Sequence, residues 1–275
     1  ITVKPGQLLP PELTNVDPQI YMMNKTIRTL SFINTGGDLL TDCSADTLPA
    51  GLQVAISTDS TTCEISGTPN SEQTTAVHTI TATNTGGESS ATVSITVVPQ
   101  TPFITRWKTD HPGTTNDNQI MISTQDSGYD YHVDWGDGSS DDNVNGNITH
   151  TYAEAGTYIV EISGDFPQIY FNRTGNDPEK ILSVEQWGNS QWRSMNRAFA
   201  GSKNVVINAT DAPDLSLVTD MSFMFNGATA FNQEIGSWNV SNVTNMRAMF
   251  SGATAFDQDI GNWDVSNVTD MSYML

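Results

Sequence analysis

Apolar and polar residues alternate along two runs of the chain, residues 77–83 and 91–97, which flank the turn sequence Asn-Thr-Gly-Gly. Because a period of two places alternate side chains on one face of a strand, the pattern predicts an antiparallel hairpin. Shorter runs bounded by Gly, Pro or Asn predict earlier strands at residues 30–33, 52–56 and 63–66. Strands this short, separated by turn residues, favour a β-sandwich over residues 1–99.

A second segment, residues 100–178, carries similar signals. Tyr158, Val160 and Ile162 occupy every second position and predict a strand with one buried face. Upstream, the sequence Trp-Gly-Asp-Gly at 135–138 contains two glycines, which permit the positive φ of a tight turn after a strand. The segment is therefore also predicted to be rich in strands.

The hydrophobic pattern then changes to a period of 25 residues. Residues 218–242 align without a gap with residues 243–267 at 17 of 25 positions, and a third copy begins at Val268. A degenerate copy at residues 192–201 is interpreted as an N-terminal cap. This period is typical of stacked repeats, in which one short unit buries its apolar face only against a neighbour. The third copy predicts that the repeats continue past the end of this sequence.

Two apolar spacings occur within each repeat. Met246, Met249 and Phe250 recur at i, i+3 and i+4, which predicts one or two helical turns. Residues 260–265 follow the LxxLxL spacing that places a short strand in a leucine-rich repeat. The methionines could form a soft-metal or haem site, but side chains that stack every 25 residues are better explained as core.

Specific motifs add family resemblances to these patterns. Leu-Pro-Ala-Gly-Leu at 48–52, followed by Ile-Ser-Gly-Thr-Pro at 65–69, closely resembles the Ig-like domains strung in tandem on bacterial surface proteins. That resemblance implies a spacer. In the second segment, Trp-Gly-Asp-Gly at 135–138 and the His-Thr-Tyr and Gly-Thr-Tyr sequences within 150–158 resemble the polycystic-kidney-disease (PKD) type of Ig-like domain.

The repeats, with the pattern MFxGATAFxQxIGxWxVSNVT, closely resemble the BspA-like leucine-rich-repeat proteins of bacterial surfaces, also found among mycoplasma lipoproteins. The match covers about residues 194–275. Together the resemblances imply a mainly β fold class: two Ig-like β-sandwich domains in tandem, followed by a leucine-rich-repeat-type solenoid with short helices. The predicted domains are residues 1–99, 100–178 and 179–275.

The chain is strongly acidic, with a formal net charge of −20. Such a surface repels nucleic acid and anionic lipid and favours divalent cations, so we expect no nucleic-acid partner. No apolar run reaches the roughly 18 residues of a membrane span, so no direct membrane insertion is predicted. A solvated acidic exterior explains the charge without any specific cation site.

Six aspartates fall between residues 126 and 142, and this density of oxygen ligands suits Ca²⁺. The spacing does not follow the EF-hand order, and uncoordinated surface aspartates are the alternative. A structural Ca²⁺ is therefore a possible cofactor. Its candidate ligands are Asp134, Asp137, Asp141 and Asp142.

The two cysteines of the chain are Cys43 and Cys63. In a Thr- and Ser-rich β segment they are predicted to form a disulfide between two strands, with two free buried thiols as the alternative. A disulfide implies an oxidising compartment, and with the resemblances it predicts an extracellular or bacterial cell-surface location.

No nucleophile elbow, HExxH motif or Gly-rich phosphate loop occurs, so no enzyme is predicted. Glu185 with Glu234 or Asp259 could supply a glycosidase pair, but nothing in the sequence fixes their separation. The chain is predicted to be a non-catalytic adhesin whose Ig-like stalk presents a repeat surface to an extracellular protein or glycan. The alternative is an accessory region of a larger secreted hydrolase, and the sequence beyond Leu275 would discriminate between them.

The candidate binding surface is the strand face predicted over residues 235–241. Ile235, Trp238 and Val240 are expected to point inward. The outward positions of this repeat and the next would form short polar ladders, with merely solvated side chains as the alternative. These candidate ligand-binding residues are Ser237, Asn239, Ser241, Asn262, Asp264 and Ser266.

Overall fold

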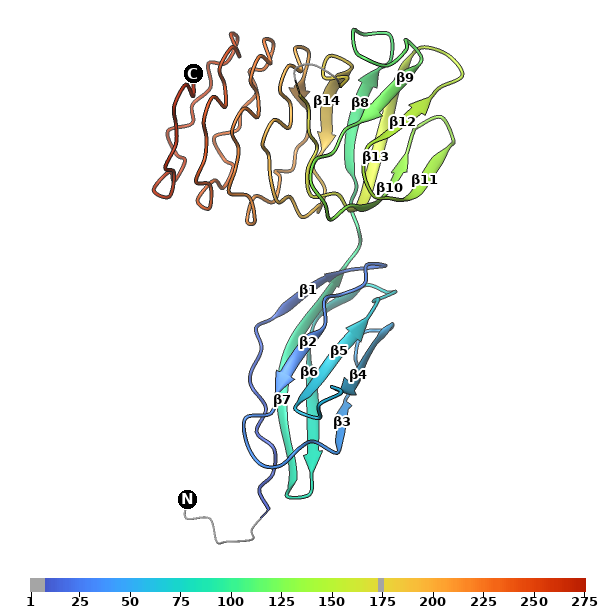
Figure 1. Cartoon of the computed structure of the whole chain (residues 1–275), viewed down its shortest axis with the longest axis vertical. Helices are drawn as coiled ribbons and strands as arrows, with labels where there is room; N and C mark the ends of the chain where they lie inside the picture. Colours follow the sequence, from blue (N-terminus) through green and yellow to red (C-terminus); the bar gives the residue numbers. More distant parts are fainter. Residues whose placement is uncertain (1–7, 173–175) are drawn as a thin grey trace. The chain divides into compact units, whose positions relative to one another are not determined.

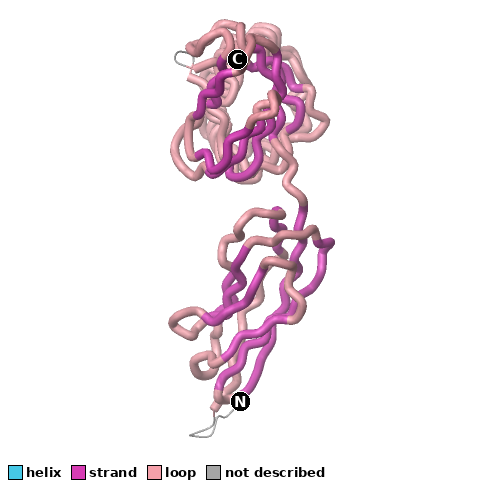
Figure 2. Tube along the Cα trace, turned by 90° about the vertical axis from the view of Figure 1, so that its right-hand side faces the viewer, coloured by secondary structure: helices cyan, strands magenta, loops and turns pink. Residues whose placement is uncertain are grey.

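The computed structural model describes residues 8–172 and 176–275, and this part of the chain consists of strands, turns and loops without a helix (Figure 2). The chain divides into two compact units, Ile1–Gln100 and Thr101–Leu275, each described here by itself (Figure 1). None of the described residues forms a helix long and apolar enough to cross a membrane.

Unit 1 is an Ig-like arrangement of two sheets. One sheet orders the strands β1 (Gln19–Met22), β7 (Gly87–Val98), β6 (Gln73–Asn84) and β3 (Asp42–Ala45). The other orders β2 (Leu30–Ile33), β5 (Thr62–Gly67) and β4 (Leu52–Ile56). The predicted hairpin is confirmed, because β6 and β7 pair antiparallel from Val77 opposite Ser94 to Asn84 opposite Gly87.

The predicted disulfide between Cys43 and Cys63 is present and joins the two sheets of unit 1. Cys43 lies in β3 and Cys63 in β5, and their Cα atoms are 5.7 Å apart. Both residues belong to the core, which also contains Phe32 and Ile80, each without exposed surface. The covalent bond therefore crosses the middle of the apolar layer.

Unit 2 begins with a six-stranded sheet. Its order is β11 (Ser140–Val144), β10 (Asp130–Asp134), β13 (Thr157–Asp165), β8 (Phe103–Lys108), β14 (Ile181–Gln186) and β15 (Val206–Ile207). A two-stranded sheet pairs β12 (Ile148–Thr151) with β9 (Gln119–Ile122). Val160 and Ile162 are buried, as the alternation in β13 predicts.

The repeats follow β14 as successive turns of the chain that lie side by side (Figure 1). Backbone donors of one turn reach acceptors of the next: Met246 N–H donates to Asp270 O and Phe250 N–H to Met274 O, each at 2.8 Å. The helix predicted from Met246, Met249 and Phe250 is therefore wrong. All three side chains are buried, but the N–H groups of Met246 and Phe250 bond to the next turn, and Met249 N–H donates to Met246 O within a local turn, so no run of helical bonds forms.

A left-handed residue stands in each turn where a helix would have to continue. Arg197, Phe223, Ala248 and Tyr273 occupy the equivalent position of four turns, with φ of 55°, 59°, 50° and 60°. A right-handed helix requires φ near −63°. The spacing of apolar residues predicted which side chains share a face, but this backbone conformation excludes the helix.

The strand predicted over residues 235–241 is also wrong, because this segment forms turns. Trp238 N–H donates to Ile235 O at 3.0 Å, which is the hydrogen bond of a local turn. Neighbouring turns are instead joined by isolated parallel bridges, from Asp220 to Asn245 and from Asn245 to Asp270. The fold class predicted for the third segment, a leucine-rich-repeat solenoid with short helices, is therefore wrong.

A single hydrophobic core runs through unit 2 from the sheet into the repeats. Trp187, fully buried after β14, lies 5.7 Å from the Phe103 ring of β8 and 5.5 Å from the Trp238 ring in the repeats. The domain boundary predicted near Glu179 lies inside this unit.

Candidate functional site

An open groove lies where two successive turns of the repeats meet. It has a volume of about 340 Å³ and is lined by Glu234, Gly236, Ser237, Asp259 and Asn262. Ser237 and Asn262 were predicted to face the same side of adjacent repeats, and the structure brings them together here. Gly236 permits the close approach, because a Cβ atom at this position would lie 2.4 Å from Asp259 O.

Buried neighbours fix the outward direction of the groove residues. Ile235, Trp238 and Val240 are at most 6% exposed, as predicted for the inward positions, whereas Ser237 is exposed. The Trp263 Nε1–H group of the following turn donates to Ile235 O at 3.1 Å. The two walls of the groove are thus attached to each other through the core.

The other predicted ladder positions form hydrogen bonds between side chain and backbone within their own turns. Asn239 Oδ1 accepts from Ser241 N–H at 3.2 Å, and Asp264 Oδ1 accepts from Ser266 N–H at 3.1 Å. Each side chain therefore stabilises its own turn. Of the six predicted binding residues, only Ser237 and Asn262 line the groove.

A short asparagine ladder joins the turns beside these positions. Asn242 Nδ2 donates to Ser216 O at 2.8 Å, and Asn267 Nδ2 donates to Ser241 O at 2.7 Å. The repetition of the Ser-Asn-Val-Thr sequence was the signal for this contact, because equivalent residues recur every 25 positions.

The groove offers hydrogen-bond donors and acceptors, and two of its acceptors are carboxylates. Ser237 and Asn262 can donate and accept, whereas Glu234 and Asp259 accept when ionised. Glu185, the third carboxylate considered for a glycosidase pair, lies on β14 and pairs with Arg106 at 2.9 Å. It is absent from the groove lining, which contains the other two carboxylates, Glu234 and Asp259.

The four aspartates predicted as calcium ligands each have a protein partner. Asp134 accepts from the Gly136 amide, Asp137 from Ser139, and Asp141 from the Trp135 indole, while Asp142 pairs with His132. Within the described residues, no group of three or more His, Cys, Asp or Glu side chains is placed to hold a metal ion. The calcium site stays a prediction that the geometry does not strengthen.

Ser139, His150 and Asp137 lie together but differ from a catalytic triad. His150 Nε2 is 2.9 Å from Asp137 Oδ2 and 3.4 Å from Ser139 Oγ. A triad uses one ring nitrogen for the serine and the other for the carboxylate. Here a single nitrogen faces both groups, and the His150 ring stacks on Trp135 with centroids 4.7 Å apart. The cluster therefore stabilises the turn.

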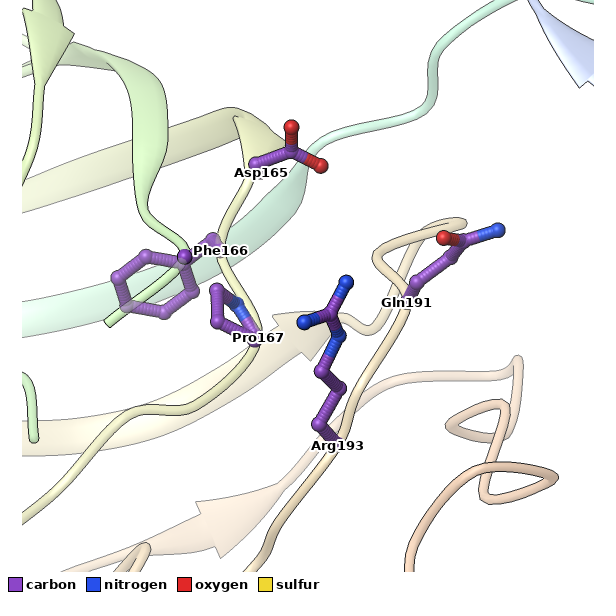
Figure 3. Close-up of a pocket in the computed structure, with 6 residues that line it drawn as sticks. Asp165, Phe166, Pro167, Gln191 and Arg193 are labelled. Atoms are coloured by element: carbon purple, nitrogen blue, oxygen red, sulfur yellow. The ribbon is translucent and has the colours of Figure 1, made fainter. Parts of the chain in front are cut away.

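A second pocket is lined by Gly128, Asp165, Phe166, Pro167, Gln191 and Arg193, and Figure 3 shows the Arg193 side chain between Pro167 and Gln191. Its cavity volume of about 10 Å³ is the room of a single water molecule. This pocket is too small for a ligand.

Two family descriptions match parts of the sequence. Residues 9–98 match the family described as "Putative Ig domain", and residues 182–275 match "Mycoplasma protein of unknown function, DUF285". The first match agrees with the Ig-like fold of unit 1. The resemblance of the repeats to BspA-like leucine-rich-repeat proteins is corrected, since the matching family carries no assigned function and the described residues contain no such solenoid. No curated protein matches the chain.

Solved structures similar to the chain include titin domains. A chimeric titin Z1Z2 is 16% identical and covers 34% of this chain and 98% of its own, with a TM-score of 0.27. Titin M4 is 9% identical and covers 33% of this chain and 98% of its own, with a TM-score of 0.28. Scores this low carry no argument about this chain.

Proposed function

We propose that the chain is a non-catalytic adhesin that acts at the bacterial cell surface or outside the cell. Ig-like domains are typical of surface or extracellular binding and stalk proteins, and unit 1 is assigned the stalk role. The repeats of unit 2 are assigned the binding role. The observation that carries this assignment is the polar groove, in which Ser237 and Asn262 of successive turns meet two carboxylates.

The groove suits an extracellular protein or glycan because its lining residues can both donate hydrogen bonds to a polar partner and accept them from it. In this proposal Glu234 and Asp259 accept hydrogen bonds from the partner and take no part in a reaction. An accessory role beside a secreted hydrolase would use the same groove. It would require that the bound ligand is the substrate of that hydrolase.

An array of purified extracellular matrix proteins and glycans tests the proposal with the 275-residue chain as probe. Ser237→Tyr and Asn262→Tyr, which fill the groove, are expected to weaken binding of a captured partner by about tenfold or more. Ala255→Tyr is the matched control, because Ala255 is exposed in a repeat and does not line the groove. Equal binding by all variants would exclude the groove, and no binding to any spot would oppose the adhesin.

A further inference from the structure

The sequence contains two Asn-Gly pairs, and the structure places them in opposite environments. Asn145 and Gly146 lie in the loop between β11 and β12, whereas Asn226 and Gly227 lie in a turn of the repeats. In such a pair the backbone nitrogen of the glycine can attack the side-chain amide carbon of the asparagine, because glycine has no Cβ atom to obstruct the approach. The reaction depends on whether these two groups are free to meet.

In the pair at 145–146 both groups are free. Asn145 is exposed, and within residues 8–172 and 176–275 neither its side-chain amide nor the Gly146 N–H group has a hydrogen-bond partner. A Cβ atom at Gly146 would meet no heavy atom within 4 Å, so the space around the glycine is open. The nucleophile and the amide carbon are therefore unobstructed.

The loop is held just after the reactive nitrogen. The Tyr131 hydroxyl donates to Gly146 O at 2.8 Å, and Thr124 N–H donates to Asn147 Oδ1 at 2.7 Å. These bonds attach the loop to the rest of unit 2 and involve neither the Asn145 side chain nor the Gly146 N–H group. The attack at Asn145 thus requires no unfolding of the strands on either side.

In the pair at 226–227 both groups are engaged. Asn226 is only 6% exposed, and its Nδ2 group donates to Ser251 O at 3.0 Å. The Gly227 N–H group donates to the same oxygen at 2.9 Å. One carbonyl of the next turn therefore binds both groups that would have to react. This pair can react only after the turn opens.

We propose that Asn145 is a site of spontaneous covalent modification, in which deamidation converts it into aspartate and isoaspartate while unit 2 stays folded. Gly146 N forms a bond to Asn145 Cγ, the Cγ–Nδ2 bond breaks, and Nδ2 leaves as ammonia with the proton of the Gly146 N–H group. Water then opens the cyclic imide. Opening at Cγ gives aspartate, and opening at the main-chain carbonyl carbon gives isoaspartate.

The modification changes the charge and the backbone path of the β11–β12 loop. Each event replaces a neutral amide by a carboxylate, in a chain whose formal net charge is already −20. Isoaspartate also adds one carbon atom to the main chain between the two strands. The site is separate from the groove at Ser237 and Asn262, so the inference does not depend on the proposed function.

Incubation of the whole chain at pH 8.5 in heavy-oxygen water tests the proposal, because the water that opens the imide leaves its oxygen in the new carboxylate. Peptide mass spectrometry measures the label at each asparagine. In the folded chain Asn145 is expected to react at least about tenfold faster than Asn226. In guanidinium chloride, which exposes both pairs, the two rates should agree within about threefold. Asn147, which precedes the β-branched Ile148, is the internal control and should stay unlabelled in the folded chain.

Gly146→Val should slow the reaction at Asn145 about tenfold or more, because a β-branched side chain obstructs the attack. The fold has room for this change, since the Cβ position is open and the φ of Gly146 lies outside the left-handed region. Asn145→Gln, a second variant, should remove the label because its longer side chain would have to close a larger ring. Thr149→Val, an exposed change in β12, is the matched control and should leave the rate unchanged.

Tryptophan fluorescence verifies the fold of each variant. The proposal is overturned if Asn145 keeps its amide in the folded chain, if Asn226 reacts as fast as Asn145 there, or if Gly146→Val reacts like the unchanged chain. The comparison of the two asparagines uses the unchanged chain alone, so it decides the question even if a variant fails to fold.

Discussion

Lys180 is a fully buried charged residue whose ammonium group is surrounded by oxygen atoms of one loop. Its Nζ donates to Thr115 O, Thr115 Oγ1, Asn116 O and Gln119 O at 2.8–3.1 Å. The buried carboxylate of Asp177 accepts from the Thr114, Thr115 and Met121 amides of the adjoining backbone. Two opposite charges therefore hold one loop, and neither was singled out by the sequence patterns.

We expect Lys180→Met to lower the free energy of unfolding of unit 2 by about 3 kcal/mol, because it leaves four loop oxygens without their donor and removes the positive charge that acts on Asp177. Urea unfolding followed by tryptophan fluorescence measures this, since all six tryptophans lie in unit 2. Lys203→Met is the control, because the Lys203 side chain is 56% exposed. Equal effects of both changes would refute the role of the buried ammonium.

The Asp137 carboxylate makes the stability of unit 2 depend on pH. Burial acts to raise the pKa of its carboxyl, but hydrogen bonds from Ser139 and His150 outweigh this and lower the pKa to about 2. The unfolded value is about 3.9. The contribution to stability is therefore present above about pH 4 and is lost as the pH falls towards 2.

Asp137→Asn should accordingly destabilise unit 2 at pH 6, and the difference from the unchanged chain should narrow between pH 4 and pH 2. Urea unfolding at pH 6, 4 and 2.5 measures the difference. If the difference in the free energy of unfolding is constant over this range, the carboxylate charge does not contribute to stability.

At the scale of secondary-structure elements, unit 1 depends on a covalent link between its two sheets. The disulfide closes a loop with a sequence separation of 20 residues. The chain-entropy model gives about 3 kcal/mol for a loop of this length. The turns of unit 2 have no such link and are held by inter-turn hydrogen bonds and by stacked rings, with Phe225 and Phe250 centroids 5.8 Å apart.

Replacing both cysteines by alanine is expected to destabilise unit 1 by about 3 kcal/mol and to leave unit 2 unchanged. Hydrogen exchange followed by mass spectrometry should show lost protection in β5 and β6 but not in β13. Tryptophan fluorescence serves as an internal control for unit 2. Loss of protection in both units would show that they unfold together.

At the scale of the whole molecule, the six-stranded sheet and the repeats share one core. Trp187 contacts rings on both sides, including Phe103 and Trp238. Stacked repeats gain stability from their neighbours, and here the first neighbour is the sheet itself. We therefore expect the sheet and the repeats of unit 2 to unfold as one cooperative unit.

Trp187→Ala should lower the free energy of unfolding of unit 2 by about 3–5 kcal/mol, since it creates a cavity at the centre of this core. Hydrogen exchange should increase together in β13 and in residues 218–250. Ile95→Ala, a buried change in unit 1, is the matched control and should leave both segments protected. Exchange that increases in the repeats alone would show two separate cooperative units.

The sequence by itself determined the features that depend on side-chain spacing. The alternation of residues 77–83 and 91–97 predicted the β6–β7 hairpin, and the repeat pattern predicted the burial of Met246, Met249 and Phe250. It also predicted the disulfide, because both cysteines belong to short strands of one domain. These features follow from which side chains avoid water.

Only the tertiary structure decided where the backbone hydrogen bonds go. An i, i+3, i+4 spacing fits a helix, but the left-handed residue Ala248 and the bonds to the next turn exclude one. The groove at Ser237 and Asn262 also needed the structure, because the two residues are 25 positions apart and meet only when the turns stack. The local spacing of apolar residues indicates which side chains are buried, whereas the pairing of backbone groups between turns depends on the conformation of both turns.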